Sequence, residues 1–172
     1  AVALMPVFAR DILELGPWGL GLLRSAPGVG AIAMAVFLAT YPINRHAGLA
    51  MFVAVALFGL SMVVFGLSTA AWLSIGSLVF MGAADMISVY VRQTLIQLWT
   101  PDELRGRVSA VNMVFLGASN ELGEFRAGGM AALIGAVPAV VIGGVASMGV
   151  SALWAAWFPQ LRRVQHLNRV DR

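Results

Sequence analysis

The chain has 172 residues, of which 60% are hydrophobic and only 11% are charged, and its mean hydropathy is +0.87. Soluble domains carry about 25% charged residues, and a soluble chain this short has too high a surface-to-volume ratio to hide so much apolar surface. A lipid bilayer removes this conflict, so the composition predicts an integral membrane protein. The chain has no cysteine, which excludes a disulfide framework and a thiolate metal site.

The basic residues do not form a nucleic-acid-binding pattern. All eleven are arginines, and they are spread along the chain with no run of four or more. This spacing fits the ends of membrane helices and buried membrane sites better than a phosphate-binding patch. We therefore expect the lipid bilayer, and no nucleic acid, as a partner.

The N-terminal segment is too short to be a complete span. Only nine residues precede Arg10, whereas a transmembrane helix needs about 20 apolar residues. We therefore expect residues 1–13 to be a truncated span and the chain to be a fragment of a longer protein. Residues 1–158 are expected to form the transmembrane part, and residues 159–172 a basic cytoplasmic tail.

Uncharged runs divided by helix breakers predict five full helical spans after this segment. The run 47–84 is too long for one crossing, and the polar patch that starts at Ser68 divides it. The run 127–161 is divided in the same way by Gly135 and Pro138. The expected full spans are residues 17–43, 48–67, 72–99, 108–134 and 137–158.

Loop charges and tryptophans orient these spans. Cytoplasmic loops carry an excess of arginine, so the side with seven arginines is predicted to be cytoplasmic, together with the C-terminus, while the other side carries only Arg10. Indole rings prefer the headgroup boundary, and all five tryptophans fall near expected span ends. The seven arginines are Arg45, Arg105, Arg107, Arg162, Arg163, Arg169 and Arg172. The tryptophans are Trp18 and Trp72 at the outer ends, and Trp99, Trp154 and Trp157 toward the inner ones.

The expected cytoplasmic connection around residue 100 has the features of a helix start. Thr100 can cap the helix, Pro101 suits its first turn, and Glu103 stands three residues after the cap. Arg105 and Arg107 follow at the membrane surface. The local pattern predicts a capped helix with basic anchors.

Six charged residues fall inside the expected spans, where each costs about 2.5–3.5 kcal/mol at the helix centre unless it has a partner or a polar cavity. Asp85 and Arg92 share one helical face with Ser88, but they lie about 10.5 Å apart along the axis, which is too far for an ideal direct pair. They either flank a cavity or pair with other helices. The six residues are Arg24, Asp85, Arg92, Glu121, Glu124 and Arg126.

The next expected span, 108–134, also has polar stripes. Asn112, Ser119 and Arg126 recur every seven residues, and Asn120 and Glu124 form a neighbouring stripe. Two adjacent helices with polar faces suggest a common polar interior. For Asp85 and Glu124, a functional cavity and structural pairing between helices both remain open at this point.

The chain lacks the residues of intramembrane enzymes. Intramembrane proteases need an embedded Ser–His pair or paired aspartates, but the two histidines, His46 and His166, fall on the expected cytoplasmic side, and Asp85 has no second aspartate at its depth. No metal-ligand spacing occurs either. We expect no enzymatic activity, no cofactor and no metal.

Four segments resemble the C-terminal half of major facilitator superfamily transporters: LMPVFARDIL, GPWGLGLLRSAPGVGA, TPDELRGRVSAVN and GASNELGEF. The branch that they resemble is that of enterobactin-exporter-like proteins or transmembrane secretion effectors, and PDELRGRV is the most specific piece. The resemblance implies an all-α membrane protein that contains the end of helix 7 and helices 8 to 12. Two positions depart from the pattern: Arg126 stands where relatives carry an acidic residue, and the stretch YPINRHAG keeps Arg45 but has Asn44 in place of the acid.

The resemblance further implies a secondary transporter in the bacterial inner membrane, an exporter of small molecules that is driven by the proton gradient and works by alternating access. Its partners would be an N-terminal six-helix half and an unidentified small-molecule substrate. A non-transporting membrane scaffold or half-length assembly subunit is the alternative. The candidates for substrate binding or coupling are Asp85, Arg92, Glu121, Glu124, Asn120 and Asn112. The candidates for cytoplasmic gate contacts are Asp102, Glu103, Arg105, Arg107 and Arg45.

The arginine asymmetry makes a first prediction about topology. Because the chain has no cysteine of its own, single cysteines report accessibility in intact cells. In the full-length protein, Gln165→Cys should resist a membrane-impermeant thiol reagent, since the C-terminal tail is expected in the cytoplasm, whereas Glu14→Cys should react. The reverse labelling pattern would overturn the predicted orientation.

Overall fold

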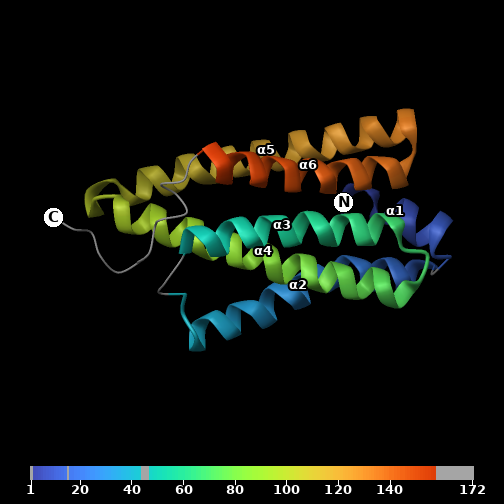
Figure 1. Ribbon diagram of the computed structural model, residues 1–172, viewed down its shortest axis with the longest axis horizontal. Coiled ribbons are helices and arrows are strands. Elements are labelled where there is room, and N and C mark those ends of the chain that lie inside the picture. Colours follow the sequence, from blue (N-terminus) through green and yellow to red (C-terminus); the bar gives the residue numbers. More distant parts are fainter. Residues whose placement is uncertain (1, 15, 44–46, 158–172) are drawn as a thin grey trace.

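The computed structural model describes residues 2–14, 16–43 and 47–157, and every regular element in these ranges is helical. Five long helices run back and forth along the long axis of the molecule, after three short helical turns at the N-terminal end (Figure 1). The short turns are η1 (Val2–Leu4), α1 (Met5–Val7) and η2 (Phe8–Ile12). The long helices are α2 (Gly16–Thr40), α3 (Ala47–Leu67), α4 (Ala71–Trp99), α5 (Arg105–Ile134) and α6 (Ala136–Trp157), with the short turn η3 (Asp102–Leu104) before α5.

The long helices lie within a few residues of the expected ranges, and the differences come from local chemistry at their ends. α2 ends at Thr40 rather than at residue 43, because Pro42 has no N–H to continue the helical hydrogen bonds. Between α3 and α4, the Ser68 hydroxyl accepts a hydrogen bond from the backbone N–H of Ala70. α5 and α6 are separated by Gly135 alone, whose φ of 92° is a conformation that residues with a side chain rarely adopt.

The expected capping of α5 by Thr100 is wrong. Thr100 is the C-terminal cap of α4, where both its backbone N–H and its hydroxyl donate hydrogen bonds to the carbonyl of Ile96. No side-chain cap forms at the start of η3 or α5. The Asp102 carboxylate pairs instead with Arg105, at 2.8 Å from Asp102 Oδ1 to Arg105 Nη1. Because its hydroxyl is engaged within α4, Thr100 cannot cap the following helix.

Four of the long helices are long and apolar enough to cross a membrane, and the protein is a multi-pass membrane protein. They are α2, α3 from Gly48 onward, α4 and α6. α5 does not reach the same apolar character, because asparagine, glutamate and arginine residues interrupt its middle. That residues 108–134 cross the bilayer, as expected above, stays a prediction.

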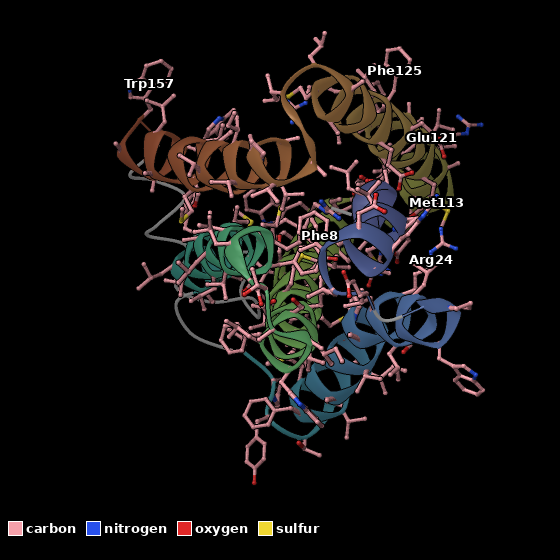
Figure 2. All side chains as sticks on the ribbon, turned by 90° about the vertical axis from the view of Figure 1, so that its right-hand side faces the viewer. Phe8, Arg24, Met113, Glu121, Phe125 and Trp157 are labelled. Atoms are coloured by element: carbon pink, nitrogen blue, oxygen red, sulfur yellow. The ribbon has the colours of Figure 1, made fainter. Side chains whose placement is uncertain are left out.

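The N-terminal turns insert into the centre of the bundle and hold part of its core. Met5 and Phe8 are fully buried, and the Phe8 ring packs on Phe65 of α3 with centroids 4.5 Å apart. Figure 2 shows Phe8 directed into the middle of the bundle, whereas Trp157 points outward at its periphery. The same core includes Leu23 of α2 and other buried residues of α3, α4 and α6. This short segment therefore contacts helices that follow it by more than 50 residues.

Helices α2 and α4 touch backbone to backbone at two glycines. A Cβ atom on Gly82 of α4 would lie 1.9 Å from the carbonyl oxygen of Pro27 in α2, and one on Gly30 would lie 1.8 Å from the carbonyl oxygen of Val79. Only residues without a Cβ permit this approach, and close backbone contact is a main source of helix association in lipid. α3 packs along α4 and α6, and Gly59 there approaches Gly144 in a similar way.

Buried hydroxyl groups find partners within the bundle. The Ser74 hydroxyl donates to the Ser68 hydroxyl at 3.0 Å, which ties the start of α4 to the end of α3. The Ser151 hydroxyl of α6 donates to the carbonyl of Phe52 in α3 at 3.1 Å. In lipid, hydrogen bonds between helices of this kind contribute roughly 0.6 kcal/mol each.

The α2–α4 contact makes a prediction about stability. Gly82→Ala should destabilise the protein by about 1–3 kcal/mol, because the new methyl group overlaps the Pro27 carbonyl and the helices have to separate. Gly76→Ala, six residues earlier in α4, is the matched control, since its Cβ would meet nothing within 4 Å. It should leave stability unchanged or raise it slightly, because alanine favours helix more than glycine does. Melting temperatures in detergent measure both, and equal values for the two variants would contradict the contact.

Candidate functional site

Residues of the five long helices line a cavity of about 520 Å³ that is open to the outside. Every one of them contributes to its lining, and most of the polar groups come from α4 and α5. The lining residues are Pro27 of α2; Phe58 and Met62 of α3; Met81, Gly82 and Asp85 of α4; Ser119, Asn120, Gly123, Glu124, Arg126, Ala127 and Met130 of α5; and Ala139, Ile142, Gly143 and Ala146 of α6. The volume lies within the range of about 300–1,000 Å³ that is typical of small-molecule sites.

The charged groups of this cavity are Asp85, Glu124 and Arg126. Within the described part of the chain, none of the three has a salt-bridge partner within 4.0 Å or a hydrogen bond from its side chain. Two carboxyl groups and one guanidinium therefore share the lining, and the charge of Arg92, seven residues after Asp85 on α4, also acts on Asp85. Without salt-bridge partners, the three lining groups are available to a ligand or to protons.

The α2–α4 contact sets the position of Asp85. Gly82, which touches the Pro27 carbonyl, lies three residues before Asp85 on α4, and all three residues line the cavity. Residues three apart share a helical face, so the face of α4 that packs on α2 continues into the cavity at Asp85. Asp85 is exposed, and it lies one turn after the close contact between Gly82 and the Pro27 carbonyl.

The rest of the wall is apolar and rich in methionine. Phe58 and Met62 come from α3, Met81 from α4 and Met130 from α5, and Met62 and Met81 are almost fully buried. Sequence reasoning missed the three methionines as site residues, because buried methionine in a membrane helix is most often core. What brings them together is packing between helices that are far apart in the sequence.

Three of the predicted binding candidates, Arg92, Asn112 and Glu121, do not line this cavity. Arg92, on α4, is half-buried, and its Nε atom is buried without a hydrogen-bond acceptor among the described residues. Arg92 and Asp85 do not form a direct ion pair, as their axial spacing predicted. Asn112 borders a separate hollow of about 460 Å³ near the start of α5, together with Ile96 and Arg107.

Glu121 lies outside the cavity, on the exposed surface of α5. Figure 2 places it on the same side of the bundle as Met113 of α5 and Arg24 of α2, with the N-terminal turns between the two helices. Neither Glu121 nor Arg24 has an ion-pair partner within the described residues. Of the four residues predicted on α5, the structure therefore brings Asn120 and Glu124 to the cavity with Asp85, and leaves Asn112 and Glu121 elsewhere.

The gate candidates cluster at the connection between α4 and α5, at the end of the molecule opposite α1 (Figure 1). Asp102, Glu103, Arg105 and Arg107 are all exposed there. The ion pair between Asp102 and Arg105 is local, so it joins no second helix. Arg45 lies outside the described residues, as does the tail 159–172.

The described residues do not group in a way that would hold a metal ion, since no three histidine, aspartate or glutamate side chains come together in them. The side chains that line the cavity can do two things chemically. Its carboxylates can bind a proton or a cationic group, and its apolar wall can bind a hydrophobic body.

Comparison with protein families gives one match that spans nearly the whole chain. The family is described as transmembrane secretion effector, within the major facilitator superfamily, and its model matches residues 1–171. No curated protein and no solved structure matches the chain.

The lining of the cavity makes a prediction about water access. Ile142 and Val145 of α6 are exposed to a similar degree, 46% and 52%, but only Ile142 lines the cavity. A thiol reacts with a charged methanethiosulfonate reagent as the thiolate, which forms in water. In the intact protein in liposomes, Ile142→Cys should therefore react about tenfold or more faster than Val145→Cys, which faces away from the polar lining. Equal rates would show that the cavity is no wetter than the outer face of α6.

Proposed function

Because the chain belongs to the transmembrane secretion effector family of the major facilitator superfamily, we propose that it is part of a secondary active transporter, a proton-coupled exporter of small molecules, and not an enzyme. One observation carries this proposal. Two carboxylates, Asp85 and Glu124, stand unpaired on one cavity of ligand size that is built from five membrane-bundle helices. In a non-transporting scaffold, carboxylates without a salt-bridge partner at such a position would not be expected, because each destabilises the protein in lipid.

The carboxylates supply the coupling in this proposal. A carboxylate in the membrane is stabilised when it binds either a proton or a cationic group, so protons and substrate compete for the same site. Alternating access then exposes the site to one side of the membrane with substrate and to the other with protons. Asn120 adds a neutral hydrogen-bonding group beside Glu124, and Arg126 keeps one positive charge in the cavity throughout.

The exposed state of α5 supports a second six-helix half as partner. α5 has no buried residue along 30 positions, although it carries Glu121 in its middle. Within a bilayer, the charged residues of such a surface are costly in contact with lipid, so another polypeptide is expected to pack on it. We propose that the N-terminal half of the same transporter supplies this cover and the other wall of the transport path.

The orientation follows from charge. We propose that the protein lies in the bacterial inner membrane with its C-terminus in the cytoplasm, so that the connection between α4 and α5 faces the cytoplasm. Arg107 and Glu103 would then make gate contacts with the other half, while Asp102 and Arg105 remain paired to each other. Arg92 lies on α4 outside the lining, and we propose that its buried Nε, which has no acceptor among the described residues, binds one in the complete transporter.

A proton-release assay tests the proposed function. Vesicles that contain the full-length protein and an imposed proton gradient are given a panel of cationic, neutral and anionic amphiphiles, and the loss of the gradient is recorded. We expect at least one class of compound to collapse the gradient, and we expect Asp85→Asn to abolish that response, since asparagine cannot exchange a proton. The melting temperature of Asp85→Asn should stay within about 2 °C of the parent if the carboxylate is not structural.

Asp11→Asn is the control, because it also removes a carboxylate but lies in η2 at the exposed end of the bundle, beside Arg10. It should keep the full response. An unchanged response in Asp85→Asn would remove that residue from the mechanism, and a large fall in its melting temperature would assign it to the architecture. Vesicles that respond like protein-free ones to the whole panel would contradict a transporter.

A further inference from the structure

We propose that the cavity selects amphiphilic organic cations, and that Asp85 and Glu124 recognise their charge while the methionine-rich wall binds their apolar body. This inference rests on the proposed function and names the substrate class of the same site. Nothing in the family match specifies that class. The juxtaposition that carries it is an apolar wall and an excess of negative charge on the same surface.

The charge of the lining decides the sign of the ligand. Asp85 comes from α4, Glu124 and Arg126 come from α5, and within the described residues none of them is neutralised by a salt bridge. Arg126 offsets one of the two carboxylates of the lining, and Arg92, whose charge acts on Asp85, is not a lining residue. A monovalent cation therefore neutralises the ionised lining, whereas an anion of the same size raises its net charge.

The apolar wall decides the character of the ligand. Phe58 presents a ring, and organic cations bind favourably over aromatic faces. Met62, Met81 and Met130 present thioether sulfurs, which are polarizable and adapt to ligands of different shape. A small hydrated cation gains nothing from such a wall, and the described residues hold no group of three metal-ligating side chains. The combination fits a positive charge that is carried on a hydrophobic body.

The glycines leave room for that body. A Cβ atom on Gly123 of α5, which lines the cavity between Asn120 and Glu124, would meet nothing within 4 Å. The cavity volume of about 520 Å³ accommodates a drug-sized molecule. Gly123 thus leaves space between the two polar residues of α5, Asn120 and Glu124, that line the cavity.

Two ions of the same size and shape but opposite charge test this inference. Binding of radiolabelled tetraphenylphosphonium and of tetraphenylborate to the full-length protein in nanodiscs is measured by equilibrium dialysis, with protein-free nanodiscs subtracted. We expect saturable binding of the phosphonium cation and binding of the borate anion that is about tenfold or more weaker. Equal or tighter binding of the borate would overturn the inference.

Single-charge variants assign the effect to this cavity. Asp85→Asn and Glu124→Gln should each weaken phosphonium binding by about tenfold, and Arg126→Gln should strengthen it, because the positive neighbour of the cation is gone. Asp11→Asn, outside the cavity, should change nothing. If phosphonium binding is absent, or if it is insensitive to all three cavity variants, the cavity does not select cations.

Failure here is distinguishable from failure of the proposed function. A collapse of the proton gradient by anionic or neutral amphiphiles alone, lost in Asp85→Asn, would leave the transporter standing and refute the cation class. A panel with no response in any class, combined with saturable phosphonium binding, would keep the binding site and refute transport.

Discussion

The contact between the backbones of α2 and α4 is the constraint on which the rest of the bundle depends. At Gly30 and Gly82, each helix presses against a carbonyl oxygen of the other, so no side chain fits between them. In lipid, where burying apolar side chains gives little net gain, such close packing is what orders the helices. Pro27, at the centre of this contact, also frees the carbonyl of buried Leu23 from its usual helical donor, which makes α2 easier to bend there.

The cavity follows from this contact by geometry. α4 is held against α2 on one face and against α3 on another, so its remaining face opens toward α5 and α6. Asp85 lies three residues after Gly82, where the face of α4 that packs on α2 continues into the cavity. α5 packs mainly on α6, and its polar stripe faces the same space. The position of the charged residues thus depends on which helix faces carry residues small enough for close packing. It does not depend on attraction between the charges themselves.

The helical segments were largely predictable from the sequence, because breakers act locally. Gly135 needs a positive φ and Ser68 hydrogen-bonds to its own turn, so both divide apolar runs wherever those runs lie in space. The capping at Thr100 failed because the same residue can end one helix as well as start the next, and the hydroxyl bond to Ile96 decided between them. Pro42 moved the end of α2 for an equally local reason.

The composition of the cavity was predictable only in part. Helical periodicity places Asn120 and Glu124 on neighbouring stripes of one face, and the structure brings them to one cavity with Asp85. Periodicity does not say which stripe faces inward, so Asn112 and Glu121, on the same helix, were equally good candidates and lie elsewhere. The contributions of Met62 and Ile142 depend on contacts between helices separated by some 80 residues, which no local pattern contains.

The single-residue link at Gly135 has a consequence for membrane insertion during synthesis. The hydropathy of α5 is too low for it to partition into lipid by itself, as the other four long helices can. The sharp reversal at Gly135 leaves almost no chain between it and α6, which is strongly apolar. For α5 to enter the bilayer it has to do so as one half of a hairpin, with α6 supplying the driving force for both. On the prediction that α5 crosses the bilayer, α6 is therefore needed for the integration of the helix that precedes it.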